Sequence, residues 1–340
     1  MKRKLLVIMI SLLALSLMLT ACSSGDKTPT PEQPEEQKVV IKGGSDGAPT
    51  LPPNMAIKFM HEFVSDESEG RMEVEFYESR QLGSSSELIE QVMNGTIDFC
   101  LTGTPTMSQH TPLLEVLQLP FLLNNYEKEF ASARTPEFKA ITAAIEEKFN
   151  VKIIGLYENG IRHFANNKRP VNTLEDVKGL KLRVVPSNLI LGSMELFGAN
   201  PTPMAYGEVY TALQNKVIDG CEINWTSIYS EKFYEQLKYV SEIGLFPFPS
   251  MYLVNLDFWN TLSAEDQQIM LDAADKAMDE NLRIMAEVEK NGRDTAVESG
   301  VEVNQVENLD PFFEKVESLY DEYTAKDPLM KNFVDMAKNL

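Results

Sequence analysis

The stretch NGTIDFC at residues 94–100 returns in altered form as NKVIDGC at residues 215–221, with Asn, Ile, Asp and Cys in the same places. An apolar-periodic run stands ahead of each copy, LIEQVM ahead of the first and VYTALQ ahead of the second. A run of this kind, followed by a polar turn and a short apolar segment, is typical of a helix, a tight turn and a strand. The chain therefore repeats one α/β unit, which favours a fold with two related halves.

Strand patterns alternate with helix patterns on both sides of the two copies. VVIKG at 39–43 and VKIIGLY at 151–157 are strand-like, and a long helical pattern begins after Ser263. Such alternation predicts parallel sheets built from βαβ units. We expect a bilobal α/β domain over residues 38–340, with an N-terminal lobe at about 38–157, a C-terminal lobe at about 158–250, and bracing and C-terminal helices at about 251–340.

The first residues have the pattern of an export signal. MKRK is followed by the apolar run LLVIMISLLALSLMLT, which is too short to span a membrane comfortably. The run ends in Leu19-Thr20-Ala21-Cys22, which resembles the lipobox of bacterial lipoproteins, in which the cysteine is lipidated and becomes the mature N-terminus. We expect a signal peptide at 1–22 that ends in lipidated Cys22, then a disordered tether at 23–37, rich in Pro, Glu, Ser and Thr.

Charge and composition exclude some functions. The formal net charge is −20, so nucleic acid is not an expected partner, because binding it takes concentrated Lys and Arg. The three histidines lack metal-ligand spacing, and no metal or cofactor is expected. Cys100 and Cys221 end equivalent units, so we interpret them as buried apolar residues, with a disulfide as the alternative.

The sequence has no nucleophile elbow, HExxH motif, phosphate loop or GxGxxG motif. Two arginines are the candidate functional residues instead. Arg183 lies in the apolar strand pattern LKLRVVP, where a buried guanidinium needs an anionic partner. That partner is a ligand carboxylate or a structural Asp or Glu, and the residues alone favour neither. Arg162, in ENGIRHF, is by itself a surface-loop charge.

The second half resembles the substrate-binding proteins of TRAP (tripartite ATP-independent periplasmic) transporters. KGLKLRVVPSN and LFGANPTPMAYGEVYTALQNKVIDGCE are similar to the family's ordered motifs, and EGRMEVEFYESRQLGSSSELIEQVMNGTIDF is similar to its N-terminal lobe. The resemblance runs from about Val39 to near the C-terminus. It implies a bilobal fold that closes over an organic acid and performs no reaction.

The resemblance also implies roles for individual residues. Arg183 corresponds to the arginine that pairs with the ligand carboxylate, and Arg162 to a second arginine at the ligand. Tyr206 falls where an aromatic residue stacks on the ligand, and Ser85 at a polar position of the N-terminal lobe that faces the cleft. Glu222 corresponds to a carboxylate that orients an arginine without touching the ligand.

The sequence departs from the family pattern after Glu222. Many members have Asn directly after this glutamate, whereas this chain has Ile223, with Asn224 one position later. We expect Asn224 to replace the missing amide contact. By resemblance, a second Asn here favours a uronate or another sugar acid over a four-carbon dicarboxylate or a keto acid, which remain alternatives.

The expected function is capture of an organic acid by a monomeric lipoprotein on the outer side of the bacterial cell membrane, for delivery to TRAP permease subunits. Three other classes of protein remain open. They are a binding protein of an ABC transporter, a ligand-binding module that signals to a receptor, and an extracellular hydrolase. The ordered motifs speak against the first, and the lack of a nucleophile–base pair speaks against the last.

Overall fold

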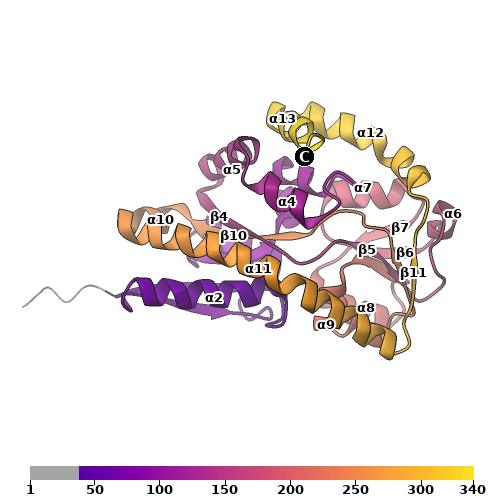
Figure 1. The fold of residues 1–340 in the computed structure, drawn as a ribbon, viewed down its shortest axis with the longest axis horizontal. Helices are drawn as coiled ribbons and strands as arrows, with labels where there is room; N and C mark the ends of the chain where they lie inside the picture. The colour runs from indigo at the N-terminus through magenta and orange to yellow at the C-terminus, as the bar shows by residue number, and fades with distance from the viewer. Residues whose placement is uncertain (1–37) are drawn as a thin grey trace, which may run out of the picture. The chain divides into compact units, whose positions relative to one another are not determined.

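The computed structural model describes residues 38–340, drawn in colour in Figure 1. The predicted signal peptide, the lipidation of Cys22 and the tether fall in residues 1–37 and lie outside the described residues. The described part is an α/β fold with one sheet of five strands and one of six, as expected for a bilobal binding protein. None of the helices between residues 38 and 340 combines the length and apolar character needed to cross a membrane.

The first sheet is mixed. Strands β1 and β2, and β1 and β3, pair in parallel, whereas β10 runs antiparallel to both of its neighbours. The strands, in their order across the sheet, are β2 (Met72–Tyr77), β1 (Val39–Ser45), β3 (Phe99–Gly103), β10 (Pro249–Asn255) and β4 (Val151–Glu158). The helices of this half are α2 (Pro52–Glu67), α3 (Ser85–Met93), α4 (Tyr126–Ala133), α5 (Pro136–Phe149) and α10 (Leu256–Thr261).

The second sheet is mixed as well. Strand β5 runs antiparallel to β8 and β9, and β6 runs parallel to β7 and β8. The strands, in order, are β11 (Glu302–Gln305), β9 (Tyr239–Glu242), β5 (His163–Asn166), β8 (Gly220–Ile223), β6 (Lys181–Val184) and β7 (Asn200–Pro203). The helices of this half are α6 (Leu174–Val177), α7 (Asn188–Leu196), α8 (Val209–Gln214) and α9 (Trp225–Ser230).

The predicted parallel pairing therefore does not extend to β5 and β10, which run antiparallel to their neighbours. Each is the first strand after the chain has crossed from one sheet to the other, and each enters its new sheet against the direction of its neighbours. Strand β10 also lies at the start of the region expected to hold only bracing and C-terminal helices. Its side chains are buried on both faces, in keeping with its place between β3 and β4.

The two copies of the repeat occupy equivalent places in the two sheets. Asp98 of the first copy accepts a hydrogen bond from the backbone nitrogen of Lys42 on β1, at 2.8 Å, through its Oδ2. Asp219 of the second copy accepts one from Lys181 on β6, at 3.0 Å, in the same way. The repeated aspartate thus ties each unit to the neighbouring parallel strand. Cys100 and Cys221 are buried free thiols, one in each sheet.

Helix α11 (Ala264–Glu298) packs against α2 in the first half and α9 in the second, and runs diagonally across Figure 1. Its 35 residues correspond to about 50 Å of α-helix. Ser263 caps its start by accepting a hydrogen bond from the backbone of Asp266 at 3.0 Å. At Gly292 a Cβ atom would lie 2.6 Å from the carbonyl oxygen of Trp225, so this glycine allows α11 to approach α9 closely. The chain ends with α12 (Asp310–Lys326) and α13 (Pro328–Ala337).

Candidate functional site

A cavity is lined by residues from both halves of the fold. The first half contributes the segment after β1, the start of α3 and the segment after β3, and the second half contributes β6, the segment after β7 and α9. The centre of a water-sized sphere can occupy about 90 Å³ of this cavity. Since one water takes about 10–15 Å³ on this measure, the cavity has room for several waters or a small organic molecule.

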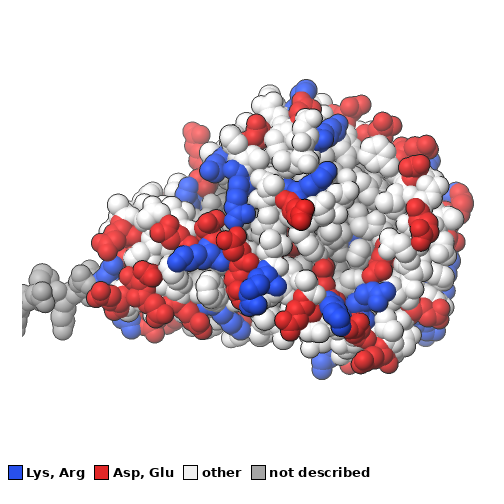
Figure 2. All heavy atoms as spheres, viewed as in Figure 1, with Lys and Arg blue, Asp and Glu red and all other residues white. Residues whose placement is uncertain are grey.

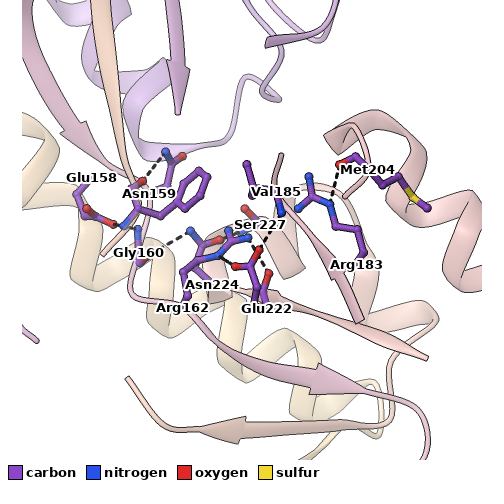
Figure 3. Close-up of polar contacts among 11 residues, drawn as sticks. Glu158, Asn159, Gly160, Arg162, Arg183, Val185, Met204, Glu222, Asn224 and Ser227 are labelled. Carbon is purple, nitrogen blue, oxygen red and sulfur yellow. Dashed lines mark hydrogen bonds and ion pairs between the residues drawn. The ribbon is translucent and has the colours of Figure 1, made fainter. Parts of the chain in front are cut away.

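Arg183 brings an unbalanced positive charge to this cavity. It lies on β6 and is only 2% exposed. Its Nε donates a hydrogen bond to the carbonyl oxygen of Met204 at 2.9 Å, as Figure 3 shows, whereas Nη1 has no hydrogen-bond partner among the described residues. Burial lowers the pKa of Arg183, and the nearby Glu222 carboxylate partly opposes this effect. A buried donor without a partner is costly, so an incoming anion would satisfy it.

Arg162, in contrast, already has a carboxylate partner. Its Nε lies 2.5 Å from Oε2 of Glu222, and its Nη2 donates to the Glu222 carbonyl oxygen at 2.7 Å. Its guanidinium carbon also lies 4.3 Å from the centroid of the Phe248 ring, a cation–π contact. In Figure 3 the side chains of Arg162 and Glu222 point toward one another. Arg162 lines the cavity, and Glu222 has the geometry of a residue that orients it from behind.

Tyr206 and Ser85 also line the cavity, from opposite halves of the fold. Tyr206 starts a short 3-10 helix after β7, and its ring packs edge-on against Phe233 with centroids 6.1 Å apart. Burial raises the pKa of the Tyr206 hydroxyl, which keeps it neutral. Ser85 is the first residue of α3, and its Oγ donates a hydrogen bond to Oδ2 of Asp46 at 2.5 Å.

Asn224 is placed differently from the sequence-based expectation. It is fully buried, it is not among the lining residues, and it serves as the N-cap of α9. Its Oδ1 accepts from the backbone of Ser227 at 3.1 Å, and its Nδ2 donates to the Gly160 carbonyl oxygen at 3.2 Å. Both ends of the amide are therefore used inside the protein. Ser227, one turn into the helix, lines the cavity instead.

Sequence reasoning missed Asp46 and Asn159, which also line the cavity. Asp46 follows β1 in the stretch GGSDG, whose glycines are typical of a turn. The available signal was its position just beyond the carboxyl end of a parallel strand, where ligands of open α/β sheets bind. Asn159 lies in the crossover after β4, and its Nδ2 donates to Oγ of Ser250 at 2.8 Å.

Two arginines are thus buried at the cavity of an acidic protein. Arg162 and Arg183 are among the largest fully buried side chains. On the surface, Figure 2 shows acidic side chains gathered over the end of the fold formed by α2 and α10, with basic side chains between them. The two arginines therefore differ in sign from the net charge of the protein, which lets them attract an anion locally without making the whole protein adhere to anions.

Comparison with known proteins extends these observations. Residues 45–327 match a family described as "Bacterial extracellular solute-binding protein, family 7". A solute-binding protein of Chromohalobacter salexigens is 31% identical over 286 residues, which is 84% of this chain and 85% of the relative.

Two crystal structures of TRAP periplasmic solute-binding proteins have the same fold. One, from Chromohalobacter salexigens, holds D-glucuronate; it is 30% identical, with a TM-score of 0.84, and covers 88% of this chain and 99% of its own. The other, from a Sulfitobacter species, holds β-D-galacturonate; it is 29% identical, with a TM-score of 0.83, and covers 88% of this chain and all of its own. These matches confirm the resemblance seen in the sequence, and the chain belongs to family 7 of the bacterial extracellular solute-binding proteins, the substrate-binding proteins of TRAP transporters.

Proposed function

We propose that this protein captures a sugar-acid anion, a uronate or a related hydroxylated monocarboxylate, and that Arg183 pairs with the ligand carboxylate. The observation that carries the proposal is the buried Arg183 guanidinium, whose Nη1 has no hydrogen-bond partner within residues 38–340 and which lies in a cavity lined by hydroxyl and amide groups. The uronates held by the two similar crystal structures support the same ligand class. A planar guanidinium binds a carboxylate through two parallel hydrogen bonds, which fixes one end of the ligand.

The remaining lining residues fit the other parts of such a ligand. Tyr206 offers a ring face for the carbon skeleton, and Ser85, Asn159 and Ser227 offer hydroxyl and amide groups for the ligand hydroxyls. Arg162 adds positive charge that Glu222 holds in place. Asn224 has no part in this proposal, because its amide is used in capping α9.

Capture proceeds by closure of the two halves and involves no chemical reaction. Ligand contacts come from both sheets, so a bound acid stabilises the state in which the two sets of lining residues face each other. An ion pair already joins the halves at this place: Arg80, ahead of α3, lies 3.2 Å from Glu231, at the end of α9. Release then requires that a partner reopen the halves, and the membrane permease subunits of a TRAP transporter are the proposed partner.

The proposal places the protein outside the cytoplasm, held to the cell membrane by lipid on Cys22. The support is the charged start, the apolar run and the lipobox-like Leu19-Thr20-Ala21-Cys22, followed by a polar segment suited to act as a tether. The protein would act there as a monomer without a cofactor. Labelling with a radioactive fatty acid in the native bacterium tests the anchor, because Cys22→Ser should abolish incorporation.

Thermal melting of the purified protein tests the ligand class. The panel contains uronates, aldonates, four-carbon dicarboxylates, keto acids, and neutral galactose and glucose as controls for the carboxylate. A uronate or aldonate at about 100 times its dissociation constant should stabilise the protein by about 2.7 kcal/mol, and the neutral sugars should not. The proposal is wrong if no carboxylate raises the melting temperature, or if galactose raises it as much as galacturonate does.

A further inference from the structure

The cavity contains a carboxylate as well as arginines. Asp46 follows β1 and lines the cavity from the half of the fold opposite Arg183. Its Oδ2 accepts the hydrogen bond from Ser85, and no hydrogen bond from a described residue reaches its Oδ1. A carboxylate in a cavity that binds an anion repels that anion, and the repulsion is strong where water is excluded. The presence of Asp46 therefore calls for a functional explanation.

The nearest arginine does not neutralise Asp46 by a direct ion pair. Nη1 of Arg80 donates to the backbone carbonyl oxygen of Asp46 at 3.0 Å, not to its carboxylate. The same guanidinium makes a two-point contact with Glu231, at 3.2 and 3.3 Å. Arg80 therefore fixes the position of the Asp46 backbone while Glu231 takes up its charge.

Burial raises the pKa of Asp46, and the hydrogen bond from Ser85 and the charge of Arg80 work in the opposite direction. Ser85 also fixes the orientation of the carboxylate, because one of its two oxygens is held while the other remains available to a ligand. The cavity thus presents a positive charge at Arg183 from one half of the fold and a hydrogen-bond acceptor at Asp46 from the other half.

We infer that Asp46 is a specificity-determining residue: it accepts hydrogen bonds from hydroxyl groups at the end of the ligand remote from the carboxylate, and it excludes acids that have a second carboxylate there. This inference rests on the proposed function and narrows its substrate class to polyhydroxylated monocarboxylates. A uronate presents hydroxyl donors at that end, whereas the matching aldarate presents a charge of the same sign as Asp46. Selectivity of this kind comes from repelling the wrong ligand as well as from binding the right one.

Isothermal titration with matched acids tests this role. D-galacturonate and galactarate share the stereocentres C2–C5 and differ in oxidation state at C1, where galactarate has a second carboxylate, and D-glucuronate and glucarate form a second such pair. Because the uronates close to a ring through C1 and the aldarates do not, the change in preference on Asp46→Asn, and not the preference of the natural protein alone, reports on charge. The natural protein should prefer each uronate to its aldarate by at least about 100-fold, in the range reached when a buried polar site rejects a mismatched ligand. Asp46→Asn removes the charge at constant size, and this preference should fall by about tenfold or more, with tighter binding of the aldarate.

Two further variants separate the repulsion of the aldarate by Asp46 from a change in hydrogen bonding and from a general loss of negative charge. Ser85→Ala frees the Asp46 carboxylate but keeps its charge, so uronate binding should weaken while the aldarates stay excluded. Asp279→Asn removes the same charge from α11, where the side chain is 73% exposed, and should change neither affinity. Melting of each unliganded variant shows whether it folds, and the ratio of the two affinities is read only from folded protein.

The possible results separate the role of Asp46 from the proposed function. Unchanged uronate-to-aldarate preference in folded Asp46→Asn would overturn the role of Asp46 and leave the proposed function standing. Equal affinity of the natural protein for both acids would do the same. Binding of none of the four acids by the natural protein would overturn the proposed function, and this inference with it.

Discussion

Nε of Arg162 lies 2.5 Å from Oε2 of Glu222, and both side chains are buried, with 2% and 0% exposure. The second oxygen of the same carboxylate accepts a hydrogen bond from the backbone of Val185 at 3.2 Å, two residues after Arg183. Glu222 therefore holds one arginine directly and fixes the chain just beyond the other. The ion pair neutralises the charge of Arg162, whereas Nη1 of Arg183 has no hydrogen-bond partner among the described residues. We therefore assign the ligand carboxylate to Arg183.

Loss of the Glu222 charge should destabilise the protein strongly. Glu222→Gln leaves Arg162 buried without its counter-charge, and breaking a buried ion pair in this way costs about 3–5 kcal/mol. Urea unfolding of the unliganded protein measures the change. The matched control is Glu175→Gln, which removes an exposed partner of Lys178 and should cost less than about 1 kcal/mol. Equal losses in the two variants would contradict the structural role of Glu222.

Asn224→Ala should affect folding more than binding. The substitution removes the N-cap of α9 and the hydrogen bond to Gly160, and loss of a cap costs about 0.5–2 kcal/mol. Uronate affinity, measured by titration calorimetry, should stay close to that of the natural protein. A large loss of affinity with unchanged stability would instead restore Asn224 as a direct ligand contact.

The buried carboxyl group of Glu289 should contribute a loss of stability as the pH rises from about 4.5 to about 7. Burial, with Glu158 and Glu242 nearby, raises the pKa of Glu289 from 4.5 to about 7, although the Tyr126 hydroxyl donates a hydrogen bond to it. The folded state thus holds a proton that the unfolded chain releases in this range, so stability present below pH 4.5 is lost as the pH passes 7.

Burial also raises the pKa of Glu129 and Glu158, which contribute with the same sign. Burial lowers the pKa of His61 to about 3 and of His163 to about 4, and these histidines contribute with the opposite sign below about pH 6.5, so a variant is needed to isolate Glu289.

Melting curves at several pH values measure the slope of stability against pH for the natural protein and for Glu289→Gln, and the variant should gain stability relative to the natural protein as the pH rises from about 4.5 to about 7. The exposed Glu265→Gln on the same helix should keep the natural slope. Identical slopes in all three proteins would show that Glu289 does not carry a raised pKa.

The ion pair between Arg80 and Glu231 should slow ligand release. It joins the two halves next to Tyr206, whose ring centroid lies 5.9 Å from the Arg80 guanidinium carbon. Partly exposed pairs contribute about 0.2–1 kcal/mol, so Glu231→Gln should raise the dissociation rate by a factor of up to about five. Stopped-flow competition measures this rate. Glu280→Gln, which breaks a pair within α11, is the control and should leave the rate unchanged.

Much of the fold followed from local patterns in the sequence. The repeated Ile-Asp after an Asn turn marked equivalent units because Asp98 and Asp219 each tie their own unit to a neighbouring strand. Arg183 stood out because a charged residue in an apolar strand is costly without a partner. These signals lie within a few residues of the feature that they predict.

What could not be predicted depends on pairings between distant segments. The position of β10 between β3 and β4 joins residues about 100 or more positions apart, and its direction follows from a crossover that leaves no local pattern. The side chain of Asn224 is held away from the cavity partly by its hydrogen bond to the carbonyl oxygen of Gly160, which lies between β4 and β5. That contact joins residues far apart in the sequence and leaves no local pattern. Asp46 was missed because its partner Ser85 lies 39 residues away.

Arg183 is the proposed anchor of the ligand carboxylate. Titration calorimetry of D-galacturonate with the natural protein and with folded Arg183→Ala tests this directly. Removal of one partner from a buried, hydrogen-bonded charge pair costs about 2–5 kcal/mol, so the variant should bind at least about 30-fold more weakly. If Arg183→Ala binds the acid as tightly as the natural protein does, the carboxylate lies elsewhere and the account is wrong.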